Sequence, residues 1–246
     1  MLGTHRSPPG IAMKSLIILL LLLPLGVKAA SELVFNTTGQ SPLNRPDGSG
    51  FMDRVTSEAL SRIGYGLKRV KLPAERGLVN VNRGIDDGEM SRIAGLDTIY
   101  TNMIRVPEKI MDWEFVVFSK KTLNLSQGWH SLNKKQLAFI NGWKILEKNI
   151  PESALVNKVK TEKQLFLLLE KDRTDYVIFE KWAGLELIKN QGYKDIRLLL
   201  PPLAVKDMYI YLNKKHENLI APLSNALKTL KQEGIYQNLE QSILMR

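Results

Sequence analysis

Short apolar runs alternate with segments of helical periodicity in the first half of the chain. Leu33-Val34-Phe35 is an apolar run of strand length, and apolar residues then recur at helical spacing until Gly64. Phe115-Val116-Val117-Phe118 is a continuous apolar run, which is typical of a strand buried on both faces. The segment that leads to Pro107 has no regular pattern. Strand, helix, strand, helix, strand and a further strand are predicted over residues 33–35, 51–63, 67–72, 74–82, 90–93 and 115–118.

The pattern then restarts in the second half. Leu137-Ala138-Phe139-Ile140 and Tyr176-Val177-Ile178-Phe179 are again apolar runs of strand length. Helices are predicted over residues 143–149, 161–170, 181–190 and 216–244, with a last strand over residues 208–212.

This order of elements predicts an α/β fold. Strands that alternate with helices favour right-handed crossover units and a mostly parallel sheet. Two such units in tandem, with the second returning to the first, are the simplest arrangement. Ligands bind beyond the carboxyl ends of the strands in open α/β sheets, so two facing edges would form a ligand cleft.

The N-terminus carries the pattern of an export signal. An apolar run over residues 15–25 follows Arg6 and Lys14, and small or apolar residues end it at Ala29. The run is shorter than the roughly 20 apolar residues of a membrane-spanning helix, although a permanent anchor is the alternative. We expect a signal peptide over residues 1–29, cleaved after Ala29, with Met13 as the true start. No Cys follows the run, which predicts a product without a lipid anchor, located in the periplasm.

Composition narrows the function further. Three of the 35 basic residues lie in residues 1–29, which leaves 32 against 25 acidic residues, and these are scattered. Nucleic-acid binding usually shows a concentrated basic stripe, so it is not expected. The absence of Cys excludes disulfides and thiol chemistry. After signal removal only His130 and His216 remain, no metal-ligand spacing is present, and no nucleophile elbow or phosphate loop occurs, so neither a metal nor a cofactor is predicted.

Several short motifs occur in an order that resembles a known family. They lie at residues 47–53 (DGSGFMD), 73–76 (PAER), 87–88 (DG), 118–119 (FS), 129–132 (WHSL), 172–175 (DRTD) with Glu180, and 233–236 (EGIY). In this order, over nearly the whole of the mature chain, they resemble the family-3 extracellular solute-binding proteins, the periplasmic amino-acid receptors of ABC transporters. The chain is similar to a divergent member.

The resemblance implies a two-lobed periplasmic-binding-protein type II fold, with two mixed, mostly parallel sheets joined by a two-strand hinge. Lobe 1 would comprise residues 30–119 and 207–246, and lobe 2 residues 120–206. A monomer would close around an amino acid or related carboxylate for ABC-type uptake or sensing, with a permease in the inner membrane as partner. Two alternatives stay open: an exported enzyme of the cyclohexadienyl dehydratase type, and an orphan sensor or accessory protein without a permease.

Arginine residues are the first candidates for the ligand carboxylate. The family's usual Arg shortly before Phe118-Ser119 is missing, which puts an ordinary α-amino acid ligand in doubt. Arg92 lies where the family has its hydroxyl loop, and Arg105 and Arg76 are further candidates, because a guanidinium matches a carboxylate bidentately. Surface or structural ion pairs are the alternative role for all three.

Other candidates are implied by position. Glu180 follows a buried strand, where the family places an acidic partner for the ligand's amino group; the alternative is a solvated Glu at a helix N-terminus. Thr38 and Phe51 are candidates for lining the cleft from the first loop. Trp113 and Trp182 are interpreted mainly as packing residues.

Overall fold

The computed structural model describes residues 1–3 and 31–245. The predicted signal peptide and its cleavage position therefore lie almost wholly outside the described residues. Among the helices of the described part, none combines the length and apolar character needed to cross a membrane.

The first lobe begins with alternating strands and helices, as predicted. Its elements are β1 (Ser31–Thr37), α1 (Phe51–Arg62), β2 (Tyr65–Lys71), α2 (Ala74–Asn82), β3 (Gly88–Ile93) and the short 3-10 turn η1 (Leu96–Thr98). The terminal helices return to this lobe, because α1 contacts both α6 and α7. These last elements are η3 (Lys214–Leu219), α6 (Ile220–Gln232) and α7 (Ile235–Ile243).

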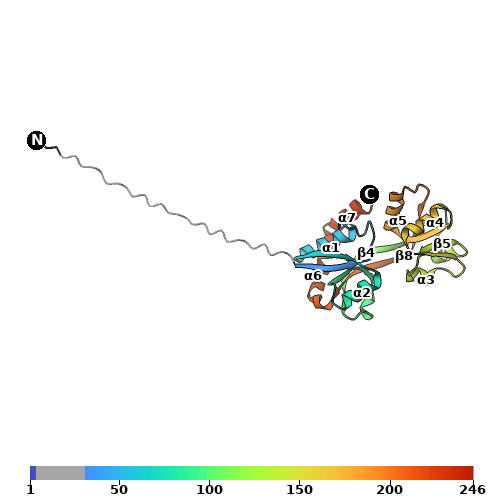
Figure 1. The fold of residues 1–246 in the computed structure, drawn as a ribbon, viewed down its shortest axis with the longest axis horizontal. Helices are drawn as coiled ribbons and strands as arrows, with labels where there is room; N and C mark the ends of the chain where they lie inside the picture. Colours follow the sequence, from blue (N-terminus) through green and yellow to red (C-terminus); the bar gives the residue numbers. More distant parts are fainter. Residues whose placement is uncertain (4–30, 246) are drawn as a thin grey trace.

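The second lobe repeats the alternation. Its elements are η2 (Gly128–Leu132), β5 (Gln136–Ile140), α3 (Lys144–Asn149), β6 (Leu155–Val159), α4 (Glu162–Glu170), β7 (Tyr176–Glu180) and α5 (Lys181–Gln191). Figure 1 shows the two lobes side by side, with α1, α2, α6 and α7 in one and α3, α4 and α5 in the other.

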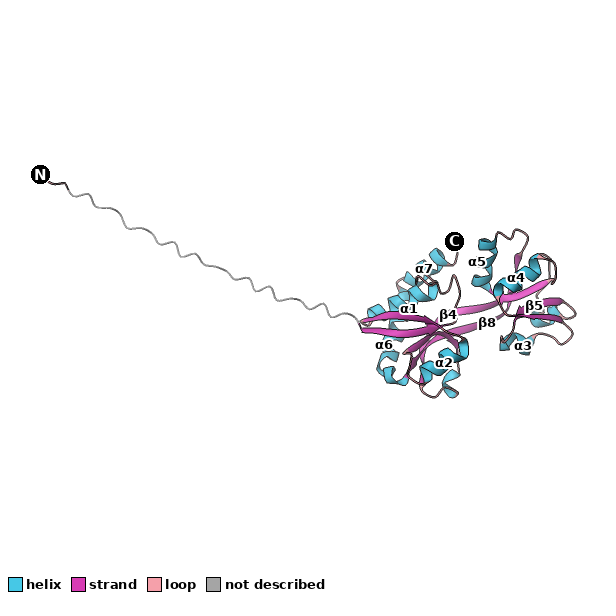
Figure 2. Ribbon diagram, viewed as in Figure 1, coloured by secondary structure: helices cyan, strands magenta, loops and turns pink. Residues whose placement is uncertain are grey.

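Two long antiparallel strands connect the lobes. β4 (Met103–Ser119) and β8 (Arg197–Asn213) pair along their whole length, from Met103 opposite Asn213 to Ser119 opposite Arg197. Figure 2 shows both strands running from one lobe into the other. The predicted two-strand hinge is therefore present, and each hinge strand is 17 residues long.

The sheet is mixed, and the long strands make it continuous. Its order is β2-β1-β3-β8-β4-β7-β5-β6. β1 is parallel to β2 and β3 in the first lobe, and β5 is parallel to β6 and β7 in the second, whereas the central pairings are antiparallel. The two predicted sheets are thus the two halves of one eight-stranded ladder, and the predicted fold class is confirmed.

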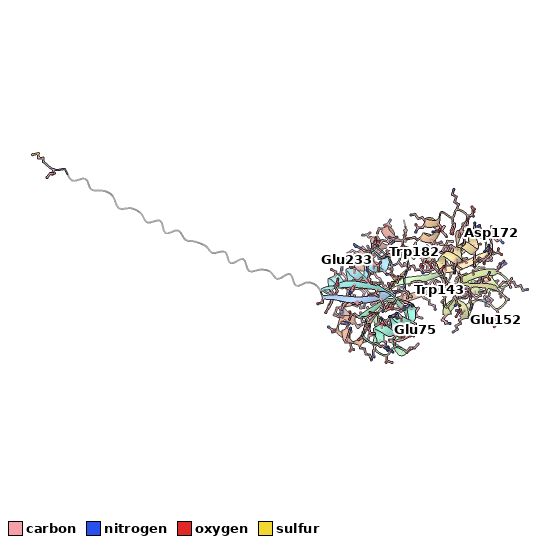
Figure 3. All side chains as sticks on the ribbon, viewed as in Figure 1. Glu75, Trp143, Glu152, Asp172, Trp182 and Glu233 are labelled. Carbon is pink, nitrogen blue, oxygen red and sulfur yellow. The ribbon has the colours of Figure 1, made fainter. Side chains whose placement is uncertain are left out.

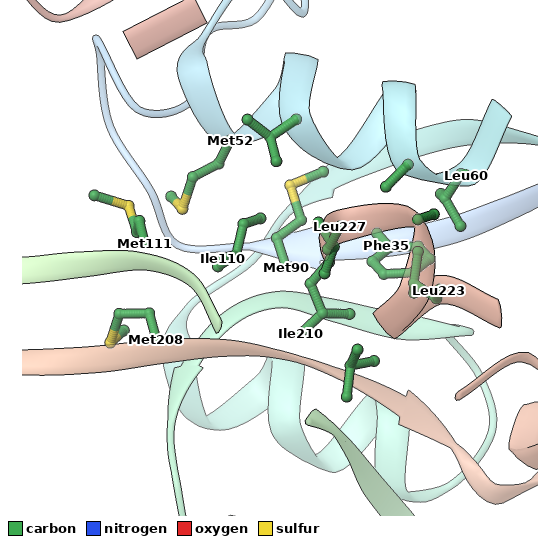
Figure 4. Close-up of a cluster of buried hydrophobic side chains, with 14 of the residues drawn as sticks. Phe35, Met52, Leu60, Met90, Ile110, Met111, Met208, Ile210, Leu223 and Leu227 are labelled. Carbon is green, nitrogen blue, oxygen red and sulfur yellow. The ribbon is translucent and has the colours of Figure 1, made fainter. Parts of the chain in front are cut away.

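Each lobe has its own hydrophobic core. Figure 4 shows the core of the first lobe, in which Phe35, Met90 and Ile210 from the sheet pack beneath Met52 and Leu60 of α1. In the second lobe two clusters lie around the alternating residues of β4, one with Phe115 and Val117 and the other with Val116 and Phe118. The core contacts of β4 change from one lobe to the other between Met111 and Phe115, which is before the predicted lobe boundary at residue 119.

Candidate functional site

A cavity of about 640 Å³ lies between the two lobes. Thr38, Lys71 and Arg92 reach it from the carboxyl ends of β1, β2 and β3, and Lys160 and Glu180 from the ends of β6 and β7. The cavity is therefore at the position expected for a ligand in open α/β sheets, and its volume is within the range of small-molecule sites.

The lining is apolar over most of its residues, with a few polar groups. The polar and charged residues are Thr38, Gln40, Lys71, Ser91, Arg92, Lys160, Glu162 and Glu180. The apolar residues include Leu43, Leu72, Trp113, Phe115, Ile140, Trp143, Ile145, Phe179, Ala183 and Met208. This combination of an apolar surface with a few placed polar groups is typical of sites for small organic molecules.

Arg92 is the main charged group on the first-lobe side. Its guanidinium lies 3.4 Å from the hydroxyl of Thr38, to which it donates, and also donates to the carbonyl of Ala74 at 3.2 Å. A register shift between Glu89 and Arg92 interrupts the pairing of β3 with β8. Such a bulge redirects side chains, so the carboxyl group of Glu89 and the guanidinium of Arg92, three residues apart on one strand, lie 3.2 Å apart.

Glu89 is a fully buried carboxyl group behind Arg92. Removal from water raises the pKa of Glu89 to about 8, and the nearby charge of Arg92 opposes this rise only in part. Although Arg92 is close, its N–H groups do not point at the carboxylate, and both Glu89 oxygens lack a hydrogen bond. At neutral pH Glu89 is therefore mostly protonated, which leaves the charge of Arg92 largely uncompensated.

Asn36 supports this protonation state. Its side-chain NH₂ donates to Gly77 and to Asp86, whereas its side-chain oxygen has no hydrogen-bond donor among the described residues. That oxygen and Oε2 of Glu89 lie 2.5 Å and 2.8 Å from the point that a Cβ on residue 77 would occupy. A protonated Glu89 places a hydrogen-bond donor in the neighbourhood of this buried acceptor, whereas an ionised Glu89 would add a second buried acceptor there.

Glu180 ends β7 and caps α5. Its two carboxylate oxygens accept the backbone N–H groups of Trp182 at 3.1 Å and Ala183 at 2.7 Å, and its exposed fraction is 1%. Burial raises the pKa of Glu180 to about 7, while the two backbone hydrogen bonds oppose this rise. Glu180 thus borders the cavity, but its carboxylate is engaged by the helix N-terminus and is buried rather than solvated.

An aromatic group forms the second-lobe side of the cavity. The ring of Trp143 stacks on Phe179 with centroids 5.2 Å apart and meets Phe115 edge-on at 5.7 Å. Trp113 also borders the cavity and packs against the cores of both lobes. Figure 3 shows Trp143 and Trp182 near the middle of the molecule, where the lobes meet.

Direct hydrogen bonds join the two lobes beside the cavity. Gln40 donates to Glu162 at 3.3 Å, and Arg45 pairs with Glu186 at 3.0 Å. The hydroxyl of Ser41 donates to the same Glu186 carboxylate. We call these three contacts the interlobe bridge; they show that the lobes are in contact in this conformation.

The other sequence candidates lie outside the cavity. Arg76 is exposed on α2, and Arg105 lies over the ring of Tyr209 at 4.6 Å, so neither lines the cavity. Phe51 is fully buried, packs edge-on against Tyr236 and borders a separate hollow of about 280 Å³. Of the six candidates, the structure brings Arg92, Thr38 and Glu180 to the cavity.

Sequence reasoning overlooked two features of the cavity. The aromatic group was missed, although Trp143 and Phe179 follow or end predicted strands, which is a usable signal. The pairing of Glu89 with Arg92 was also missed, and it depends on a bulge that no residue pattern indicates. Within the described residues no cluster of three or more His, Cys, Asp or Glu side chains is arranged to hold a metal ion.

No family model matches the sequence of this chain. An uncharacterized protein of Shewanella oneidensis is 25% identical over 195 residues, which is 76% of this chain and 73% of that protein.

Solved structures are similar over most of the chain. The ligand-binding core of GluR0 in complex with L-glutamate has a TM-score of 0.76 at 13% identity, covering 88% of this chain and 99% of that one. An amino acid ABC transporter substrate-binding protein, AbpA from Streptococcus pneumoniae bound to L-arginine, has a TM-score of 0.68 at 16% identity, covering 89% and 97%.

An ancestral amino-acid-binding protein, AncCDT-1, described as a precursor of cyclohexadienyl dehydratase, has a TM-score of 0.67 at 15% identity, covering 87% and 95%. Identities this low establish architecture alone. The chain has the two-lobed fold of the amino-acid-binding proteins, and the resemblance to family-3 solute-binding proteins is confirmed for that architecture.

Proposed function

We propose that the protein binds a small organic solute between its lobes, outside the cytoplasm, for ABC-type uptake or sensing. The observation that carries this proposal is the interlobe cavity, with Arg92 on one side and an aromatic group on the other. The interlobe bridge supports closure around a ligand, because its contacts exist only while the lobes are together. The export-signal pattern and the solved structures of similar fold agree with it.

Arg92 and Thr38 are the proposed carboxylate-binding residues. The guanidinium already donates to neutral oxygens, those of Thr38 and Ala74, which a ligand carboxylate would replace or extend with stronger charge-assisted hydrogen bonds. In this proposal the protein acts as a monomer, and an inner-membrane permease is the partner if the solute is taken up.

Thermal denaturation with a panel of amino acids, organic acids and sugars tests the proposal. A ligand at 100 times its Kd adds about 2.7 kcal/mol to the free energy of unfolding, which is a measurable shift in Tm. We expect at least one small solute to raise Tm and to bind with 1:1 stoichiometry in calorimetry. Failure of the whole panel would contradict the proposal.

One observation favours an enzyme on the same fold as a second candidate. Glu180 is a carboxyl group beside the cavity with its pKa raised to about 7, which suits a general acid. One structure of similar fold is the dehydratase precursor AncCDT-1. Turnover of prephenate or arogenate by the purified protein, lost in Glu180→Gln, would establish this activity; stable binding without turnover would support the first proposal.

A further inference from the structure

The lining of the cavity carries more positive than negative charge. Arg92, Lys71 and Lys160 border it, and Lys71 and Lys160 are exposed and form no ion pair with another residue of the described chain. Two carboxylates oppose them. Glu162 accepts a hydrogen bond from Gln40 as part of the interlobe bridge, and Glu180 is buried in its helix cap. An anion is therefore the complementary ligand.

A free amino acid also needs acceptors for its ammonium group. An ammonium carries three donors and no acceptor, and its burial without partners is costly. Glu180 is the carboxylate closest to that role by position, but both of its oxygens already accept backbone N–H groups and its exposed fraction is 1%. Glu180 is too deeply buried to offer an ammonium its remaining lone pairs, and the other carboxylate of the lining, Glu162, is half-buried and already accepts from Gln40.

The opposite side of the cavity presents aromatic surface. Trp143 is fixed by stacking on Phe179 and by its edge contact with Phe115. Both rings behind it are almost fully buried, so the position of Trp143 is set before a ligand arrives. Aromatic rings bind other rings by offset stacking or edge contacts, in addition to the burial of apolar area.

We infer that the ligand is a small arylalkyl carboxylate, an anion with an aromatic body and no ammonium group. Arg92 binds its carboxylate, and Trp143 contacts its ring. This inference rests on the proposed function and names the chemical class of the solute.

Three molecules with related skeletons test it by calorimetry and thermal denaturation. 3-Phenylpropanoate has the carboxylate and ring alone, L-phenylalanine adds the ammonium, and 2-phenylethylamine has the ammonium without the carboxylate. We expect 3-phenylpropanoate to raise Tm and to bind at least about tenfold more tightly than L-phenylalanine, with no binding of 2-phenylethylamine. 4-Methylpentanoate replaces the ring by a branched alkyl group and is expected to bind more weakly than 3-phenylpropanoate.

L-Phenylalanine binding as tightly as 3-phenylpropanoate would overturn the inference, as would the failure of every aryl carboxylate tested. These outcomes differ from failure of the proposed function. If another solute of the wider panel raises Tm, solute binding stands and only the ligand class is wrong. If no solute raises Tm, both are contradicted.

Glu180→Gln provides a second, independent measurement. The side-chain oxygen of Gln still accepts one helix N–H group, whereas the negative charge that would attract an ammonium is gone. We expect the ratio of the Kd values of L-phenylalanine and 3-phenylpropanoate to change by less than about threefold. A selective loss of L-phenylalanine binding by tenfold or more would show that Glu180 recognises an ammonium and would overturn the inference. Because the ratio is measured within one variant, altered stability does not affect it.

Discussion

The two sides of the cleft consist of different kinds of residue. On the first-lobe side, Arg92 is held by polar contacts above a buried carboxyl group, Glu89. On the second-lobe side, Trp143 is held by ring contacts that continue into the hydrophobic core. Arg92 therefore offers a charged group whose surroundings respond to pH through Glu89, whereas Trp143 and the rings behind it offer an apolar surface without titratable groups. In the proposed function, a ligand has to satisfy both sides when the lobes close.

Removal of the charge on the first-lobe side should have the largest effect. Arg92→Gln is expected to raise the Kd of a bound carboxylate about 100-fold, because hydrogen bonds to charged groups contribute roughly 1.5–3 kcal/mol each. Arg76→Gln is the matched control, since Arg76 is exposed and outside the cavity. Calorimetry measures both; equal losses in the two variants would contradict the assignment of Arg92.

Replacement of the ring on the second-lobe side should have the next largest effect. Trp143→Leu is expected to weaken binding of an aryl carboxylate about 10- to 30-fold, since an aromatic contact adds to apolar burial. Acetate has no group beyond its methyl to contact the ring, so it should bind equally to the native protein and to Trp143→Leu. If the variant loses acetate and aryl ligands alike, Trp143 shapes the whole cavity rather than one side of it.

The pH response should distinguish the two sides. As the pH rises past about 8, Glu89 ionises and its negative charge compensates the positive charge of Arg92. Asp86 is the other nearby charge that acts on the pKa of Glu89. If the anion binds well only to protein in which Glu89 is protonated, the Kd of the anion rises about tenfold between pH 7 and pH 9. Glu89→Gln should remove most of this dependence, and the remainder is expected from Glu180, which also borders the cavity and has its pKa raised to about 7. A Kd that rises equally in the variant would show that another group is responsible.

The same variant should alter stability in one direction. The pKa of Glu89 is raised in the folded protein, so its contribution to stability is complete below pH 4.5 and is lost as the pH rises to about 8. Above pH 8, Glu89→Gln should therefore be more stable than the native protein by on the order of 2 kcal/mol. Urea denaturation at pH 6 and pH 9 measures the difference; Glu180 titrates with the same sign in both proteins and cancels.

The interlobe bridge should have the smallest effect. Glu186→Ala removes the contacts with Arg45 and Ser41, which are partly exposed, so a two- to fivefold rise in Kd is expected, mainly through faster dissociation. Glu152→Ala is the control, because Glu152 is exposed on the same lobe (Figure 3). Unchanged dissociation in Glu186→Ala would show that the bridge does not hold the closed form.

Much of the fold was predictable because apolar runs set most strands and helices. β6 was missed, since its residues Leu155–Val159 are almost all exposed at the sheet edge and have no buried face to produce a pattern. The full length of β4 and β8 was missed because prolines and charges interrupt them, and β4 accommodates Pro107 at a register shift.

The site was predictable where it depends on strand ends. Thr38, Arg92 and Glu180 reach the cavity because each follows or lies near the carboxyl end of a strand. Phe51 does not, because its position at the start of α1 directs it into the core. The neighbourhood of Arg92 was not predictable, since the bulge that sets Glu89 beside it is a property of strand pairing rather than of local sequence.

The pairing of Ser119 with Arg197 also has a consequence for engineering. Ser119 and Arg197 are neighbours in the sheet, and residues 120–196 connect them. This segment is therefore an insertion at the tip of the β4–β8 hairpin. Domain insertions are tolerated at such tips, because the flanking chain ends are already close together. Trp143 and Phe179 lie in this segment, whereas Phe115 lies on β4, so replacing the segment by that of a related protein should change most of the aromatic side of the cleft and leave Arg92 in place.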